Sequence, residues 1–150
     1  LDLVLLKLRR TGLVYASVRL LPSEQVGEIT LFTPVYAVGC PLGNDPIPTP
    51  GEIASLKNAV RERNYWMVSA PTYFGNSGGG VFRADTCELI GIFSKIYTHG
   101  HGRQTVIPHM GLCTPIDAVT RWLTSVGYEC LLGDGNAVAL AASAPAFQQR

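Results

Sequence analysis

The stretch PTYFGNSGGGVF, Pro71 to Phe82, places one serine among four glycines, between two apolar arms. Glycine adopts backbone angles closed to other residues, so this composition suits a tight turn or a place where a ligand approaches the main chain. A serine hydroxyl needs a base to take its proton, and the oxyanion formed after its attack needs fixed hydrogen-bond donors. The stretch therefore has two interpretations: a glycine-rich hairpin turn, or a nucleophilic Ser77 with bare backbone around it.

The same residues fit the Gly-x-Ser-x-Gly pattern of a nucleophile elbow, in which a strand leads into the serine and a helix follows it. That arrangement also needs an acid and then a histidine after the serine. Here the residues from Val81 onward are β-like, and the histidines, at 99, 101 and 109, all precede Asp117. The context therefore excludes the elbow.

Segments on both sides of the serine favour β-structure, because they are short, rich in β-branched and aromatic residues, and bounded by turn residues. Four strands are expected in ITLFTPVYAVGC (29–40), EIASLK (52–57), NYWMVSA (64–70) and VIPHMGLCTP (106–115). Residues 79–96 predict a hairpin with its turn near residues 84–86. Residues 41–51, PLGNDPIPTPG, contain four prolines and two glycines, which predicts a loop without regular structure.

The ends of the chain differ from its middle. Residues 1–10, LDLVLLKLRR, suit a short helix or a buried strand equally well, whereas residues 17–28 and 97–104 have the composition of connecting loops. Residues 115–127, PIDAVTRWLTSVG, predict a helix with apolar positions at 116, 119, 123 and 126 that ends at Gly127. Several short strands followed by one helix indicate an all-β barrel or sandwich.

The bulk composition limits the classes of function. The 150 residues are 47% hydrophobic and 15% charged, with a formal net charge of +1, which is an ordinary globular balance. That charge gives no reason to expect nucleic acid as a partner, and no apolar run is long enough to predict a membrane segment. None of the four cysteines forms a Cys-x-x-Cys pair, so no metal and no cofactor is expected.

Several segments carry a family resemblance. GNSGG (75–79) resembles the serine signature of chymotrypsin-fold, trypsin-like serine peptidases, and LDLVLLKL (1–8) resembles the segment that holds their catalytic aspartate. AVGCPLGNDPIPTPGEIAS (37–55) is similar to the bacterial HtrA-like branch. CELIGIFSKI (87–96) resembles the strand that lines the substrate cleft, and MGLCTPIDAVTRWL (110–123) resembles the last barrel strand and terminal helix. These segments occur in the family's order.

The resemblance implies an all-β fold: the C-terminal β-barrel of a double barrel, with the last strand of the N-terminal barrel and a C-terminal helix. The corresponding divisions are residues 1–20 for the end of the N-terminal barrel and a connector, 21–130 for the barrel and helix, and 131–150 for a tail. It also implies a serine endopeptidase acting on peptides or proteins, with an extracytoplasmic location. Ser77 would be the nucleophile and Asp2 the residue that orients the general base.

The substrate site also follows from the resemblance. The backbone N–H groups of Gly75 and Ser77 would form the oxyanion hole. Three consecutive residues, Ser94, Lys95 and Ile96, would pair with the substrate as an added β-strand. The pocket for the side chain before the scissile bond would be lined by Pro71, Thr72 and Gly111. Pro71 and its neighbours offer no carboxylate, so a preference for lysine or arginine is not supported.

The family's general-base histidine lies upstream of the aspartate, whereas the three histidines of this chain follow Ser77. We therefore expect the base to lie in a missing N-terminal barrel of the same protein, and this piece alone to be inactive. The alternative is a catalytically inactive, peptidase-like module that binds peptides. A third possibility is an unrelated β-barrel with a glycine turn. The cysteines are expected to be small buried residues or a disulfide.

Overall fold

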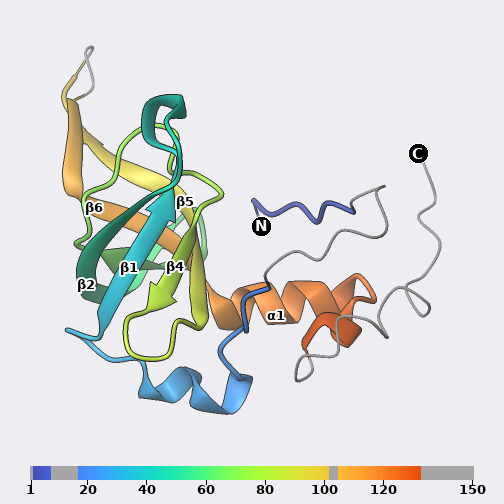
Figure 1. Ribbon diagram of the computed structural model, residues 1–150. Coiled ribbons are helices and arrows are strands. Elements are labelled where there is room, and N and C mark those ends of the chain that lie inside the picture. The colour runs from blue at the N-terminus through green and yellow to red at the C-terminus, as the bar shows by residue number, and fades with distance from the viewer. Residues whose placement is uncertain (1, 8–16, 102–104, 133–150) are drawn as a thin grey trace.

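Six antiparallel strands form a closed barrel in the order β1-β2-β3-β6-β5-β4 (Figure 1). The computed structural model describes residues 2–7, 17–101 and 105–132. The strands are β1 (Pro34–Gly39), β2 (Ile47–Val60), β3 (Arg63–Val68), β4 (Gly80–Arg83), β5 (Leu89–His99) and β6 (Thr105–Pro115). The helices are α1 (Ile116–Ser125) and the 3₁₀ turns η1 (Ser23–Glu28), η2 (Pro41–Gly43) and η3 (Glu129–Leu132). This confirms the all-β barrel with one terminal α-helix.

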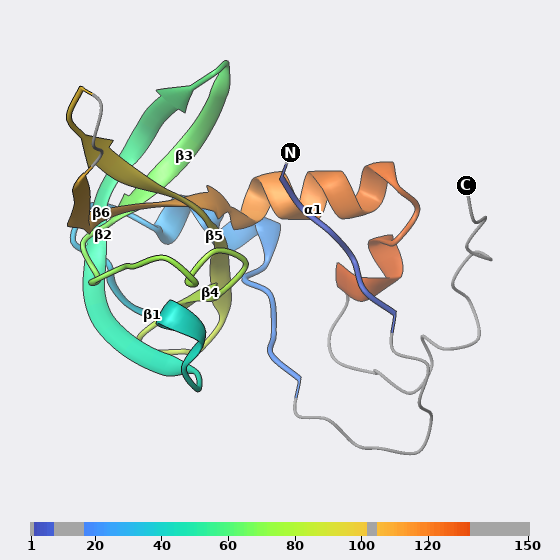
Figure 2. The ribbon, with the colours of Figure 1, turned by 90° about the horizontal axis from the view of Figure 1, so that it is seen from above.

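The barrel forms because alternate residues of its strands are apolar and point inward. In β1, for example, Val35 and Ala37 are buried while Tyr36 between them is exposed. Strand β6 runs directly into α1 at Pro115, which stands at the helix N-cap (Figure 2). The helix buries residues 116, 119 and 123 against the core, as their spacing predicts, whereas Val126 is exposed just past its end.

Strand β2 begins inside the proline-rich segment that the sequence predicts to be a loop, so that prediction is wrong from Ile47 onward. Pro48 and Pro50 face Val38 and Tyr36 of β1. The other edge of β2 pairs with β3 only from Ile53, so the prolines lie next to an edge that no other described strand pairs with. A proline has no N–H to donate, and an unpaired edge is where a sheet tolerates it.

Other boundaries also differ from the sequence predictions. Strand β1 starts at Pro34 because residues 30–33 form a turn, in which the Thr30 N–H donates to Thr33 Oγ1 at 2.9 Å. Strand β5 continues to His99, through residues expected to form a loop. Residues 2–7 contain neither helix nor strand and run beside α1 in both ribbon views (Figures 1 and 2). The expected tail lies outside the described residues from position 133 onward.

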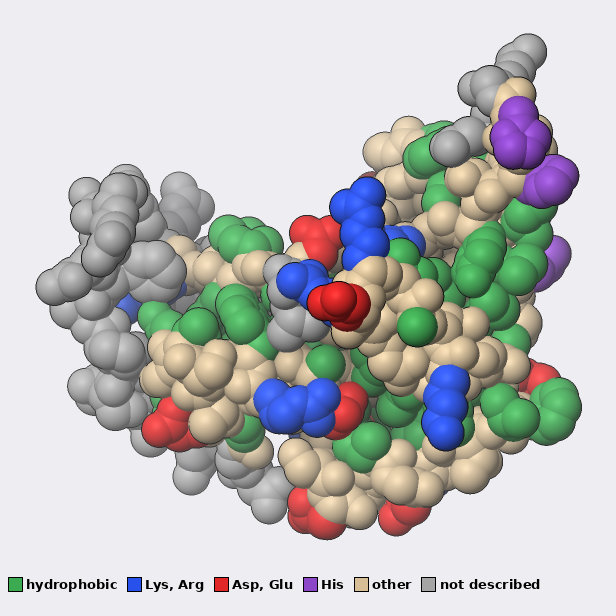
Figure 3. Space-filling view, turned by 180° about the vertical axis from the view of Figure 1, so that it is seen from behind, with side chains coloured by type: hydrophobic (Ala, Val, Ile, Leu, Met, Phe, Trp, Pro, Cys, Tyr) green, Lys and Arg blue, Asp and Glu red, His purple; other side chains and the backbone are tan. Residues whose placement is uncertain are grey.

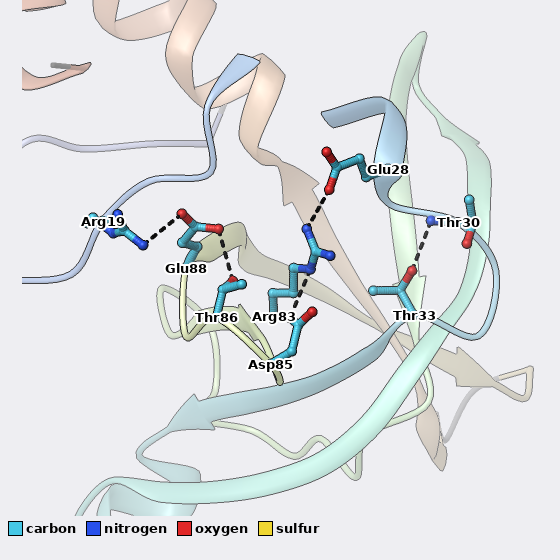
Figure 4. Close-up of polar contacts among 8 residues, drawn as sticks. All are labelled: Arg19, Glu28, Thr30, Thr33, Arg83, Asp85, Thr86 and Glu88. Carbon is cyan, nitrogen blue, oxygen red and sulfur yellow. Dashed lines mark hydrogen bonds and ion pairs between the residues drawn. The ribbon is translucent and has the colours of Figure 1, made fainter. Parts of the chain in front are cut away.

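Polar contacts fasten the chain that enters the barrel to the β4–β5 turn (Figure 4). The Leu21 N–H donates to the Leu89 carbonyl at 3.0 Å, and the Leu89 N–H donates to the Arg19 carbonyl at 2.9 Å. Two groups of side chains reinforce this junction: Glu88 with Arg19 and Thr86, and Arg83 with Glu28 and Asp85. The hydrogen bond to Glu28 raises the pKa of Arg83 above its ordinary value. The junction lies where β4 ends, and the serine loop precedes the start of β4.

Candidate active site

Ser77 lies in the loop between β3 and β4 and is exposed. Two backbone hydrogen bonds shape this loop: the Asn76 N–H donates to the Tyr73 carbonyl at 3.2 Å, and the Gly79 N–H donates to the Asn76 carbonyl at 2.9 Å. Gly75 and Gly78 have φ angles of +100° and +83°, in the region that glycine adopts at little cost. The two glycines that flank Ser77 at 75 and 78 therefore set the path of the chain around the hydroxyl.

Gly75 packs against the η2 turn between β1 and β2. A Cβ atom at this position would lie 2.4 Å from the Cys40 carbonyl oxygen and 2.9 Å from the Leu42 nitrogen. The Leu42 N–H donates to the Phe74 carbonyl at 2.8 Å. This bond fixes the peptide between Phe74 and Gly75, so the η2 turn determines how the Gly75 N–H is presented.

The N–H groups of Gly75 and Ser77 have no acceptor among the described residues. Their neighbours do: the N–H groups of Asn76, Gly78 and Gly79 all donate to backbone carbonyls. Two unpaired N–H donors separated by one residue, with the serine hydroxyl on the second, are the parts that an oxyanion hole requires.

The groups that would activate Ser77 are not assembled around it in the described part of the chain. Asp2 is exposed and forms no hydrogen bond or ion pair there, and the Ser77 hydroxyl also has no partner. The histidines gather along one edge of the molecule, on the β5–β6 hairpin (Figure 3). Of these, His109 is engaged elsewhere, with Nδ1 2.9 Å from the Ser69 carbonyl oxygen. None of the three is within hydrogen-bonding distance of Ser77.

Strand β5 is bonded directly to the serine loop. The Gly78 N–H donates to the Phe93 carbonyl at 2.8 Å, and the Phe93 N–H donates to the Gly79 carbonyl at 2.9 Å. Pairing between β4 and β5 ends at Ile92, whereas pairing between β5 and β6 continues to His99. One edge of β5 is therefore without a strand partner from Ser94 onward in the described residues, and this open edge begins beside Ser77.

The predicted substrate-strand residues lie on that edge. Between Phe93 and Lys95 the register with β6 shifts, so Ser94 occupies a β-bulge. The Ser94 hydroxyl is 2.8 Å from that of Thr114. Lys95 and Ile96 then resume pairing, opposite Leu112 and Gly111 of β6.

The predicted pocket residues Thr72 and Gly111 lie close together, and Phe93, which the sequence did not point to as a pocket residue, lies next to Gly111 as well. A Cβ atom on Gly111 would lie 2.5 Å from the Phe93 ring and 2.8 Å from Thr72 Oγ1. Thr72 is fully buried, and its N–H and hydroxyl both donate to the Pro108 carbonyl, at 2.8 and 3.2 Å. Pro71 precedes it, with its carbonyl accepting a hydrogen bond from Thr49 at 3.2 Å. The Phe93 ring thus occupies the space that a side chain at position 111 would enter.

Two features of the surface lie away from this site. Hollows of ≈ 440 Å³ and ≈ 540 Å³ lie between β3 and α1 and beside the turn before β1, and neither is lined by the serine loop. Among the described residues, no group of three or more His, Cys, Asp or Glu side chains could hold a metal ion.

The four cysteines are free thiols, so no disulfide links them. Only Cys113 is fully buried, and burial raises the pKa of its thiol to about 12. Cys40 and Cys87 are exposed, contrary to the expectation of small buried residues. Because Cys113 stays protonated at neutral pH, it is a packing residue and not a nucleophile.

Comparison with known proteins identifies similar sequences. The family model described as "Trypsin-like peptidase domain" matches residues 1–92. A probable periplasmic serine endoprotease DegP-like from Pseudomonas fluorescens is 34% identical over 86 residues, covering 55% of this chain and 17% of the relative. A protein from Marinomonas sp. with the same description is 32% identical over 107 residues, covering 67% of this chain and 21% of the relative. The chain thus spans about a fifth of these relatives.

Solved structures share the fold. The HtrA-type protease AlgW with a tripeptide superposes with a TM-score of 0.61 at 22% identity, covering 73% of this chain and 35% of that chain. The same protease with a decapeptide gives the same TM-score and identity over 32% of its length. No helix in the described part of this chain is long and apolar enough to cross a membrane.

Proposed function

The chain belongs to the trypsin-like peptidase domain family, and from this premise we propose that it is the nucleophile-bearing barrel of a serine endopeptidase. Ser77 would attack the scissile carbonyl and form an acyl-enzyme that water then hydrolyses. The observation that carries the proposal is the pair of N–H groups at Gly75 and Ser77, which have no acceptor in the part of the chain that the structure describes. They would bind the oxyanion of the tetrahedral intermediate at the residue that makes the attack.

We propose that the general base comes from outside these 150 residues. The three histidines are on the β5–β6 hairpin, and no described histidine contacts Ser77. We propose that an upstream barrel supplies the histidine, and that Asp2 orients it and stabilises its charged form. Asp2 is exposed and forms no bond with any other described residue, which leaves its carboxylate available for such a partner. The chain by itself is then expected to hydrolyse peptides poorly or not at all.

The substrate main chain would bind along the open edge of β5. Ser94, Lys95 and Ile96 would pair with it as an antiparallel strand, which gives affinity without strong demands on sequence. The residue that contributes the scissile carbonyl would direct its side chain toward Thr72 and Gly111. Because the Phe93 ring lies 2.5 Å from where a Gly111 side chain would begin, such a pocket would be shallow and would suit small apolar side chains. No carboxylate lies among its lining residues, so lysine and arginine are not favoured.

The names of the curated relatives support an extracytoplasmic location, since both are described as periplasmic. The structural neighbours are described as proteases with bound peptides, which supports a peptide or protein substrate for this chain as well.

A second candidate is a peptide-binding module that has lost catalysis. The absence of a base contacting Ser77 in the described residues favours it, because an open strand edge alone suffices to bind a peptide. Treating the full-length protein with a fluorophosphonate probe separates the two functions. We expect labelling of Ser77, absent from the Ser77→Ala variant, with hydrolysis of peptides abolished in parallel. A folded protein that binds peptides and resists the probe would instead be the binding module.

A further inference from the structure

Lys95 lies on the open edge of β5, close to the serine loop. Two residues before it, Phe93 exchanges backbone hydrogen bonds with Gly78 and Gly79, immediately after Ser77. The unpaired edge of β5 begins at Ser94. Consecutive strand residues are about 3.3 Å apart, so the Lys95 main chain is two strand steps from the serine loop.

The side chain of Lys95 lies on the outer face of the barrel. Phe93 faces Cys113 of β6, and both belong to the buried core. After the bulge, Lys95 faces Leu112, whose neighbour Cys113 points into the core. Since residues opposite one another in an antiparallel pair share a face, Lys95 and Leu112 lie on the face of the sheet opposite to Phe93 and Cys113, where Leu112 is itself buried at 3% exposure. Tyr65, which precedes the core residue Trp66 in β3, lies on the same face.

The ammonium group of Lys95 is held in place without being neutralised. Its Nζ atom lies 6.0 Å from the centroid of the Tyr65 ring, and Tyr65 is only 3% exposed. A cation over an aromatic face is attracted by the ring and keeps its full charge. No carboxylate in the described residues forms an ion pair with Lys95, whereas Arg83 and Arg121 both have acidic partners.

We propose that Lys95 selects an acidic side chain at the substrate residue immediately before the one that contributes the scissile carbonyl. This rests on the proposed function. A peptide paired antiparallel with β5 places the residue that is cut opposite Ser94, the first open position beside Ser77. The preceding peptide residue is then opposite Lys95 and shares its outer face. The residue that is cut points the other way, toward Thr72 and Gly111.

The test compares two peptides that differ only at this position, one with glutamate and one with glutamine, each with alanine at the cut residue. With the full-length protein we expect kcat/KM to be about two- to five-fold higher for the glutamate peptide, the range of a cross-strand charge pair. Lys95→Gln should bring the ratio to one, and Lys95→Glu should invert it. Lys57→Gln removes an equal charge from an exposed position on β2 and should leave the ratio unchanged.

Binding of the same peptides to the Ser77→Ala variant provides a second measurement that does not depend on catalysis. The dissociation constants should differ by a similar factor, and the difference should shrink at high salt. Equal binding and equal turnover of the two peptides would overturn the role of Lys95 while leaving the peptidase intact. A protein that neither reacts with a fluorophosphonate nor cleaves either peptide would refute the proposed function, and its peptide binding would still decide the role of Lys95.

Discussion

Replacing Gly75 with alanine should displace one donor of the candidate oxyanion hole. Gly75 has φ +100°, and its new Cβ atom would lie 2.4 Å from the Cys40 carbonyl oxygen. Both atoms are anchored in backbone, so the η2 turn or the serine loop has to move. The movement would strain the hydrogen bond from Leu42 to Phe74 and displace the Gly75 N–H.

Gly78→Ala is the matched control. Gly78 has φ +83°, so alanine meets a similar backbone penalty, about 1–2 kcal/mol. Its Cβ atom, however, would have no atom within 4 Å. The difference in stability between the two variants therefore isolates the collision with the η2 turn, for which overpacking suggests about 1–3 kcal/mol.

The two variants should also separate in catalysis. Loss of one oxyanion donor lowers kcat by about 10²–10³-fold, which is the effect expected for Gly75→Ala in the full-length protein. Gly78→Ala leaves the Gly75 N–H in place and should lower kcat by less than about ten-fold, on the same scale. Thermal unfolding and peptide hydrolysis, measured on both proteins, give the two comparisons.

Equal loss of activity in the two variants would refute the role of the Gly75 N–H, because it would then contribute nothing beyond the backbone strain that both variants share. Equal melting temperatures of Gly75→Ala and Gly78→Ala would refute the predicted difference in stability, since the η2 turn would then have moved aside without cost.

Three further outcomes are expected. Gly111→Ala places a methyl group against Phe93 and Thr72, so peptides with valine at the cut residue should lose more kcat/KM than those with glycine. Asp2→Asn in the full-length protein should lower kcat by about 10⁴-fold with little change in melting temperature, the effect typical of a catalytic-triad aspartate. Burial raises the pKa of the Cys113 thiol from 9.0 to about 12, so between these pH values the unfolded chain loses this proton while the folded chain keeps it. The free energy of unfolding should therefore fall by up to about 1.4 kcal/mol per pH unit in this range. Cys113→Ala should remove this pH dependence in denaturant titrations.

Local sequence features predicted the parts of the fold that depend on local chemistry. The terminal helix follows from the spacing of its apolar residues and from Pro115 and Gly127 at its ends. The β4–β5 hairpin follows from its apolar arms and polar turn. The loop prediction failed at Pro48 and Pro50 because a strand tolerates proline where its edge is unpaired, and this condition is not local. Which edge is unpaired depends on the position of β3, and local composition does not contain that information.

In the candidate site, too, some features follow from the local sequence and others depend on distant parts of the chain. The glycines around Ser77 were visible in the sequence, and the positive φ angles of Gly75 and Gly78 agree with the need for bare backbone. The requirement for glycine at 75, however, comes from Cys40 and Leu42, more than thirty residues earlier in the chain. The position of Phe93 beside Gly111 was not predicted, because an apolar residue in a strand gives no sign of which neighbour it will face. Its contact with Gly111 exists only through the β5–β6 register.

The glycine run also links the nucleophile to the strand edge that would bind substrate. Pairing of β4 with β5 begins at Gly80, because the preceding residues turn through Gly78 at φ +83° to expose Ser77. Gly78 and Gly79 close the ladder with one exchange of hydrogen bonds to Phe93, and nothing described pairs with β5 beyond it on that side. If a longer β4 ran on to cover Ser94 and Lys95, the serine loop could not reach this position. The exposed serine and the open edge are therefore two consequences of the same turn, and a substrate strand on that edge would lie beside the nucleophile.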